Sequence, residues 1–224
     1  MSAGSRAPLK LAILISGRGS NMVAIARACL AGKINARVRV VISDSPGAAG
    51  LASARELGIE ALTIPWPGAG NREGFERALT EALDAQPTDL VVLAGFMRIL
   101  SPAFVAHYAG RMLNIHPSLL PKYTGLHTHR RAIEAMDREH GASVHFVTAE
   151  LDGGPLVLQS RVPILPGDTE AGLAARVQAT EHIIYPQVIG MMADGRLAWD
   201  DGRVRLDGKI LEAPMESASV HARQ

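Results

Sequence analysis

Short apolar runs alternate with helix-like segments through the first half of the chain. Apolar runs, several of them rich in β-branched residues, predict strands at 9–15, 36–43, 61–64 and 90–93. Helical patterns between them predict helices at 21–31, 48–57 and 72–85, with a loop at 65–70. This alternation of strands and helices predicts a parallel sheet that is covered by helices on both faces.

The patterns in the second half are more mixed. Strands are expected at 112–116, 142–146 and 156–162, and a hairpin at 197–206 that turns at Asp201-Gly202. Helices are expected after Ser101-Pro102 and at 128–136 and 169–192. We expect one domain over residues 1–224 with two halves, 1–108 and 109–210, and a disordered tail at 213–224.

Charge and cysteine content narrow the classes of partner and compartment. Lys and Arg number 23 against 22 Asp and Glu, so a formal charge of +1 favours neither nucleic acid nor a membrane surface. The single cysteine, Cys29, excludes an internal disulfide and fits a reducing compartment. The N-terminus lacks the apolar core of a signal peptide, and no apolar run approaches the ~18 residues of a membrane span. We therefore expect a cytoplasmic protein.

A glycine-rich loop, Ser16-Gly17-Arg18-Gly19-Ser20-Asn21, follows the first strand and opens the first helix. Glycines let the backbone approach a ligand, and the free N–H groups of a helix start attract anions. Met22 stands where a dinucleotide fingerprint has its third glycine, and the lysine of a P-loop is absent. A single phosphate therefore fits better than a pyrophosphate. The alternative is a tight strand-to-helix turn in which serine caps the helix.

Asn114 and His116 lie two residues apart in the strand expected at 112–116. Alternate residues of an extended chain point to the same side, so both side chains aim at one point while Ile115 packs behind them. An amide donor beside a titratable ring suits a reaction in which an oxygen gains negative charge and a proton moves. A lone histidine would indicate only a partly buried, hydrogen-bonded side chain, but the neighbouring asparagine favours a functional role.

Asp152 precedes two glycines, which by itself indicates only a turn. The strands that flank it are expected in the same sheet as 112–116, so its carboxylate can reach the His116 ring and favour the charged imidazolium. His127 and His129 share one side only in extended structure, and no carboxylate or cysteine set lies nearby. We therefore expect these two histidines to belong to a loop and a helix start, with no metal.

Several segments together resemble the folate-dependent phosphoribosylglycinamide formyltransferase family, from Leu11 to about Trp199. The segments are Leu14 to Asn21, Leu93 to Leu100, Asn114 to Tyr123, Gly125 to His129, Ser143 to Thr148, and Asp152 to Pro155. The core Asn-x-His-Pro-Ser-Leu-Leu-Pro is shared by a wider group of formyltransferases, whereas its combination with the glycine loop and the chain length is specific. Thr124 departs from the family pattern, since relatives often carry proline there.

The resemblance implies an α/β fold with a Rossmann-like, mononucleotide-binding half of parallel strands, whose sheet is extended by a mixed, partly antiparallel second half. It implies a catalytic trio of Asn114, His116 and Asp152. For the nucleotide substrate it implies Gly19, Ser20 and Asn21 at the phosphate and Glu181 on the ribose or glycinamide side. Folate contacts are implied at Arg72, Met97, Arg98, Ile99, Leu100, Asn114, Thr148, Ala149, Glu150, Leu151 and Asp152.

The implied reaction transfers the formyl group of 10-formyltetrahydrofolate to the amine of 5′-phosphoribosylglycinamide in purine (IMP) synthesis. It gives formylglycinamide ribonucleotide and tetrahydrofolate. The amine would attack the formyl carbon directly. Asn114 and protonated His116 would then donate hydrogen bonds to the alkoxide of the tetrahedral intermediate, while Asp152 keeps His116 charged and relays a proton. The expected partners are small molecules, with 10-formyltetrahydrofolate as cosubstrate and no metal, and the expected state is a monomer or weak homodimer.

Three other functions remain as alternatives. A formyltetrahydrofolate deformylase usually carries an additional N-terminal regulatory domain, whereas the first strand here is expected from Leu9. A methionyl-tRNA formyltransferase needs a further basic, tRNA-binding domain, for which 224 residues and a charge of +1 leave no room. A dehydrogenase-like module could grip a ribose with Asp44, but the missing third glycine argues against it.

Overall fold

The computed structural model describes residues 6–66 and 72–217 of the chain. The elements of the first half are β1 (Leu9–Ile15), α1 (Ser20–Leu30), β2 (Ala36–Ser43), α2 (Ala49–Glu56), β3 (Glu60–Thr63), α3 (Arg72–Asp84), β4 (Leu90–Leu93) and α4 (Pro102–His107). Those of the second half are β5 (Met112–His116), α5 (Thr128–Glu134), β6 (Glu139–Phe146), β7 (Leu156–Pro163), α6 (Glu170–Ala193), β8 (Leu197–Asp200), β9 (Arg203–Leu206), β10 (Lys209–Ile210) and β11 (Met215–Glu216). The predicted elements of the described residues are therefore confirmed to within a few residues at their ends.

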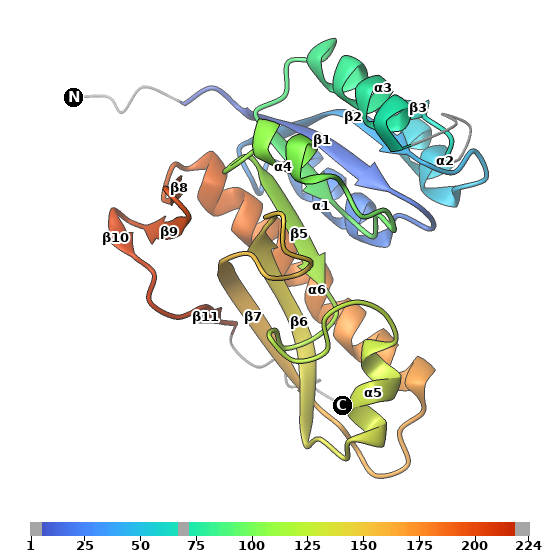
Figure 1. Cartoon of the computed structure of the whole chain (residues 1–224), viewed down its shortest axis with the longest axis vertical. Helices are drawn as coiled ribbons and strands as arrows, with labels where there is room; N and C mark the ends of the chain where they lie inside the picture. The colour runs from blue at the N-terminus through green and yellow to red at the C-terminus, as the bar shows by residue number, and fades with distance from the viewer. Residues whose placement is uncertain (1–5, 67–71, 218–224) are drawn as a thin grey trace.

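One eight-stranded sheet runs through both halves of the molecule (Figure 1), in the order β11-β7-β6-β5-β4-β1-β2-β3. The strands β3, β2, β1, β4 and β5 are parallel to one another. The strand β6 runs antiparallel to β5, and β7 runs antiparallel to β6. This sheet confirms the predicted α/β fold with a parallel first half and a mixed second half. The strands β8, β9 and β10 form a separate small sheet.

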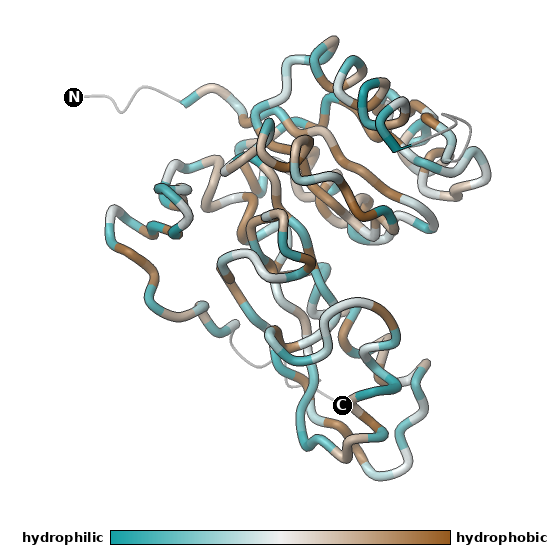
Figure 2. Tube along the Cα trace, in the orientation of Figure 1, coloured by the Kyte–Doolittle hydropathy of each residue, from teal (hydrophilic) through white to brown (hydrophobic). Residues whose placement is uncertain are grey.

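Helices cover the two faces of the sheet unequally. Helices α1 and α6 pack on one face, where buried residues from both halves form a continuous apolar core. Helices α3 and α4 cover the other face of the first half only. The strands of the first half are therefore buried on both faces, and their hydrophobic residues appear brown in Figure 2. In front of β5 and β6 the loops that follow β5 and β6 take the place of a helix (Figure 1), while α6 runs behind. The polar side chains of β5 and β6 therefore face loops and not a helix.

Two features differ from the sequence expectations. The strand β6 begins at Glu139, three residues before the expected start, because Glu139 to Gly141 pair with Arg161 to Pro163 of β7. The expected disordered tail from residue 213 instead contains β11, whose Met215 and Glu216 pair with β7. A short strand here satisfies backbone groups at the edge of β7, and two residues are too few to show a strand period. Residues 218–224 of that tail, and 67–70 of the expected loop, lie outside the described residues.

Within the two described segments, no helix has both the length and the apolar content needed to span a membrane. The long helix α6 is instead tied to the centre of the sheet by Tyr185, which is fully buried. Its hydroxyl lies 3.0 Å from the carbonyl oxygen of Leu93 and 2.9 Å from that of Leu113. Burial raises the pKa of Tyr185 well above its ordinary value, so the hydroxyl stays protonated and donates. It thereby holds the ends of β4 and β5 together directly behind Asn114.

Replacing Tyr185 with phenylalanine removes this donor and leaves two buried carbonyl oxygens without it. Leaving such a group unsatisfied costs about 1–3 kcal/mol, so we expect Tyr185→Phe to lower the free energy of unfolding by this amount. Urea unfolding followed by circular dichroism measures the change. A midpoint and slope equal to those of the wild type would show that the hydroxyl contributes nothing to stability.

Candidate active site

The end of β5 brings the predicted polar pair together with two residues of β6. Asn114 pairs directly with His145 across the antiparallel ladder, and His116 pairs with Ser143. Directly opposed residues of neighbouring strands share a face, so all four side chains point to the same side of the sheet. Leu113 belongs to the apolar core on the opposite face. The predicted alternation along 112–116 is therefore present.

The carboxylate of Asp152 reaches the imidazole of His116, as expected. Asp152 Oδ2 lies 3.5 Å from His116 Nδ1, and each side chain is only 8% exposed. The loop after β5 holds both groups. The backbone N–H of Gly125 donates to Asp152 Oδ2 at 2.8 Å, and His116 Nε2 donates to the carbonyl oxygen of Tyr123 at 2.9 Å. Since a carbonyl oxygen only accepts, Nε2 carries a hydrogen, and Nδ1 is the nitrogen that faces the carboxylate.

His145 was not expected at the site, yet it orients Asn114. His145 Nδ1 donates to the carbonyl oxygen of Phe146 at 2.9 Å, which leaves Nε2 to accept from Asn114 Nδ2 at 3.1 Å. Burial lowers the pKa of His145, so the neutral ring that this pattern requires is favoured. The strand register sets His145 opposite Asn114, with a register irregularity against β7 beside it. Register between distant strands leaves no local sign in the sequence.

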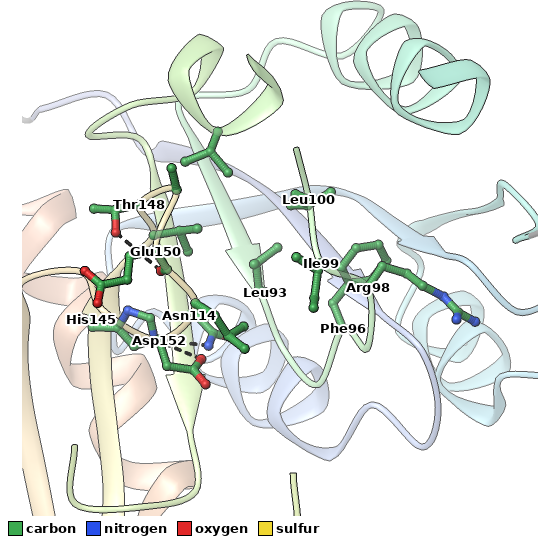
Figure 3. Close-up of a pocket in the computed structure, with 14 residues that line it drawn as sticks. Leu93, Phe96, Arg98, Ile99, Leu100, Asn114, His145, Thr148, Glu150 and Asp152 are labelled. Atoms are coloured by element: carbon green, nitrogen blue, oxygen red, sulfur yellow. Dashed lines mark hydrogen bonds and ion pairs between the residues drawn. The ribbon is translucent and has the colours of Figure 1, made fainter. Parts of the chain in front are cut away.

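A cavity opens in front of Asn114 (Figure 3). Residues from four segments line it: the end of β4 with the turn after it, α4, β5, and the end of β6 with the loop after it. Most of the residues expected to contact folate lie on its wall, namely Arg98, Ile99, Leu100, Asn114, Thr148, Ala149, Glu150, Leu151 and Asp152. His145 also lines this cavity, whereas His116 lies behind Asp152 and is not one of its lining residues.

Two residues expected to contact folate lie elsewhere. Arg72 is the first residue of α3 and lines a depression between α3 and α4, with Glu76 and Phe104. Met97 is 61% exposed and lines a second cavity, on the side of the glycine loop. The first cavity therefore brings together the predicted set without Arg72 and Met97. Arg72 is absent because the start of α3 lies beside α4 and not beside the end of β5.

The second cavity lies over the start of α1. The glycine loop 16–21 and residues of the turn after β4, of β5 and of α6 line it, including Gly95, Ile115 and Glu181. Gly19, and not a serine, is the N-cap residue of α1, with φ 69° and no side-chain hydrogen bond to the first turn. A Cβ on Gly19 would approach Gly50 Cα to 3.0 Å, which explains the glycine. The alternative of a serine-capped turn is therefore not seen, and the first N–H groups of the helix lack a side-chain cap.

A buried pair closes the floor of this second cavity. Asn21 Nδ2 donates to Glu181 Oε2 at 2.7 Å, and both residues are buried. Burial raises the pKa of Glu181, and the hydrogen bond from Asn21 opposes that rise. Asn21 Oδ1 is buried without a hydrogen-bond partner. Glu181 therefore presents an acceptor beside a helix start that favours anions, which suits a ligand with both hydroxyl groups and negative charge.

The two histidines considered for a metal do not form a site together. His127 is the N-cap residue of α5, whereas His129 Nδ1 lies 3.1 Å from His140 Nε2. Among residues 6–66 and 72–217, no group of three or more histidine, cysteine or acidic side chains is placed to hold a metal ion. Asp44, considered as a ribose ligand, is buried and paired with Arg98, so it is not free to bind one.

Comparison with known proteins places this geometry in a family. Residues 9–189 match the family model described as formyl transferase. The chain belongs to the formyl transferase family. The family match spans both cavities and all of β1 to β7, so the whole candidate site lies inside it.

Similar proteins within the formyl transferase family share nearly the full length of the chain. A phosphoribosylglycinamide formyltransferase of Escherichia coli is 56% identical over 203 residues, which cover 91% of this chain and 96% of that protein. A solved phosphoribosylglycinamide formyltransferase of Coxiella burnetii has 48% sequence identity and a TM-score of 0.90, with 94% of this chain and all of that chain covered.

The deformylase among the similar structures shares much less of its sequence with this chain. A formyltetrahydrofolate deformylase of Pseudomonas syringae has a TM-score of 0.83 but only 21% identity. The match covers 89% of this chain and 66% of the deformylase chain. At that identity the likeness shows a shared fold and nothing about the reaction.

Burial of the His129–His140 pair makes stability depend on pH. Burial, together with the nearby His129, lowers the pKa of His140 from 6.5 to about 4. As the pH falls from 6.5 towards 4, the unfolded chain takes up a proton that the folded chain excludes, so the free energy of unfolding falls. We expect the thermal midpoint to decrease between about pH 7 and about pH 4.5. Differential scanning calorimetry across this range measures it.

His140→Gln should flatten this pH dependence, because the side chain that resists protonation is gone. The matched control is His107→Gln, which changes an exposed histidine at the end of α4. This control should keep the wild-type slope. Equal slopes for all three proteins would show that His140 does not carry the effect.

Proposed function

We propose that the protein transfers the formyl group of 10-formyltetrahydrofolate to the amine of 5′-phosphoribosylglycinamide, a step of purine synthesis. The observation that carries this proposal is that neighbouring residues of β5 line two different cavities. Asn114 lines one and its neighbour Ile115 lines the other. Members of the formyl transferase family use formyltetrahydrofolate as cosubstrate. A formyl group held in the first cavity would thus face an amine held in the second.

Asn114 and Asp152 are the groups that contact the reacting atoms in this mechanism. The amine attacks the formyl carbon, and the carbonyl oxygen becomes an alkoxide. Asn114 Nδ2 donates one hydrogen to His145 and keeps the other for this oxygen. Such a donor is typically worth about 3–4 kcal/mol of transition-state stabilisation. Asp152 accepts the proton that the amine loses and passes it to the leaving nitrogen. Holding both substrates in line also lowers the entropic part of the activation barrier.

His116 supports Asp152 and reaches the alkoxide only after a change of partner. Its Nε2 is engaged with the carbonyl oxygen of Tyr123, and its Nδ1 faces Asp152. Direct donation to the alkoxide, as expected from sequence, therefore requires the ring to release Tyr123. In the structure, His116 instead faces Asp152 Oδ2 and helps to hold this carboxylate in place.

The binding roles follow the two cavities. We assign the phosphate to the start of α1 at Gly19, Ser20 and Asn21, and a ribose or glycinamide hydrogen bond to Glu181. The first cavity takes the folate, bounded by Arg98 to Leu100 and by Thr148 to Asp152. Met97, between the two cavities, is assigned to both ligands. Arg72 does not line this cavity, so its folate contact has no support from the structure.

The remaining properties are proposed from composition and from the continuous sheet. A single catalytic domain over residues 1–224 is supported by strands of both halves in one sheet. We also propose that the enzyme needs no metal and is a monomer or weak homodimer. Its action on small molecules in the cytoplasm is supported by the +1 charge and the single cysteine. Burial raises the pKa of Cys29 to about 11, so this thiol stays protonated and unreactive.

An absorbance assay for the folate product, tetrahydrofolate, tests the reaction itself. We expect product only when 10-formyltetrahydrofolate and 5′-phosphoribosylglycinamide are both present, because the amine is the attacking group. Product formed equally fast from the folate alone would identify the deformylase reaction and contradict the transferase.

Variants of the His116–Asp152 pair test the mechanism. We expect Asp152→Asn to lower kcat by about 10²–10⁴-fold, the typical contribution of a positioned proton-transfer group. His116→Ala should also lower kcat, because it removes the side chain that holds Asp152 in place. Circular dichroism should remain that of the wild type. Asp207→Asn is the matched control, since it changes an aspartate in an exposed ion pair with Arg196. Full activity in Asp152→Asn would remove Asp152 from the mechanism.

A further inference from the structure

The side chain of Arg98 leaves the cavity that its own residue lines. Arg98 lies in the turn after β4, between Phe96 and Leu100, and all three residues bound the cavity assigned to folate. In Figure 3 its guanidinium extends away from Asn114 and Asp152. The charged end of this residue therefore acts outside the pocket, and its effect on the pocket passes through the backbone of the turn.

An ion pair ties this guanidinium to a distant strand. Arg98 Nε lies 2.5 Å from Asp44 Oδ2, and the Asp44 side chain is 0% exposed while that of Arg98 is 34% exposed. Asp44 directly follows β2, whereas Arg98 follows β4, and β1 separates these strands in the sheet. A buried carboxylate is costly unless a charge compensates it. Arg98 supplies that charge, so the turn after β4 is drawn towards the end of β2.

An aromatic group fixes the same guanidinium from a second direction. Arg98 Cζ lies 5.5 Å from the ring centroid of Trp66, within the range of a cation–π contact. The backbone N–H of Trp66 donates to the carbonyl oxygen of Asp44 at 2.9 Å. Trp66 packs edge-on against Phe75, and Phe75 stacks on Phe96 of the cavity wall. The three residues Asp44, Trp66 and Arg98 thus form one connected clamp beside the turn.

The turn is held at its other side by the end of β1. The Met97 N–H donates to Ser16 Oγ at 2.8 Å, and the Ser16 N–H donates to the carbonyl oxygen of Gly95 at 3.0 Å. The clamp and Ser16 therefore fix opposite parts of one short turn. Backbone groups placed in this way can recognise the edge of a flat polar ring, and their accuracy depends on how firmly the turn is held.

We propose that Asp44 and Trp66 are positioning residues for the folate cosubstrate. They hold the Arg98 side chain outside the pocket, and this sets the backbone from Phe96 to Leu100 that forms one wall of it. The proposal rests on the proposed function and deepens it. It also separates two roles of Arg98: its backbone borders the ligand, and its guanidinium is an anchor that does not touch the ligand.

The test compares Asp44→Asn, Arg98→Met and the double variant with the wild type. Calorimetry gives the Kd of tetrahydrofolate, and steady-state kinetics give kcat and both KM values. We expect each single variant to raise the tetrahydrofolate Kd by about tenfold, since small misplacements of binding groups have effects of this order. The KM of the ribonucleotide should rise by less, because Met97 is the one residue of 96–100 that lines the second cavity. The double variant should be no worse than Arg98→Met, because both changes break one clamp.

Two further variants test whether the effect on folate binding is specific to the clamp. Arg111→Met removes a guanidinium that lies 5.6 Å from the Tyr108 ring, a similar contact away from the cavity, and should leave both affinities unchanged. Trp66→Leu breaks the clamp without exposing or burying a charge, so it applies even if the ion-pair variants do not fold. It should weaken tetrahydrofolate binding by about threefold, in line with the modest strength of a cation–π contact.

Three outcomes would contradict the proposed role of the clamp. Weaker binding in Arg98→Met with wild-type binding in Asp44→Asn and Trp66→Leu would show that Arg98 contacts the ligand itself, and would overturn the proposal. Wild-type affinity in all variants would overturn it too, as would additive losses in the double variant. A wild-type protein that fails to bind tetrahydrofolate would instead overturn the proposed function.

Discussion

The site depends on the pairing of one short strand, β5, with two neighbours of opposite direction. Parallel pairing with β4 places the turn after β4 beside Asn114, and antiparallel pairing with β6 places His145 directly opposite it. Because β6 runs antiparallel to β5, its last residue, Phe146, lies opposite Leu113 near the start of β5, and the loop that follows folds back to place Asp152 beside His116. The turn after β4 and the strand β5 each contribute residues to both cavities.

Each buried carboxylate at this end of the sheet has a specific donor. Asp44 pairs with Arg98, Glu181 accepts from Asn21, and Asp152 accepts from the Gly125 N–H and faces His116. The donors differ in kind, and the three carboxylates therefore have different roles. A permanent cation makes Asp44 a structural anchor. A neutral amide leaves Glu181 an acceptor for a ligand. A histidine ring and a backbone N–H hold the carboxylate of Asp152 at the wall of the first cavity.

Periodic patterns predicted most of the fold, because burial on one or both faces leaves a trace in consecutive residues. The pair Asn114 and His116 could be predicted for the same reason. His145 could not, since its role comes from a register between two strands, and β11 is too short to leave a period. The Tyr123 and Gly125 contacts depend on backbone atoms, which any residue carries. Arg72 matched the family pattern, but the packing of α3 on α4 decides which depression it lines.

The second cavity distinguishes transfer from hydrolysis on physical grounds. A hydrolase needs only a water molecule near the formyl carbon, and Asp152 with Asn114 would suffice to activate it. The chain in addition leaves the start of α1 without a side-chain cap and keeps Glu181 buried beside it, and both features cost stability without a ligand. Features that oppose folding persist where a bound group compensates them. In the proposed reaction, a phosphate-bearing amine in this cavity would compensate both features and displace water from the formyl carbon.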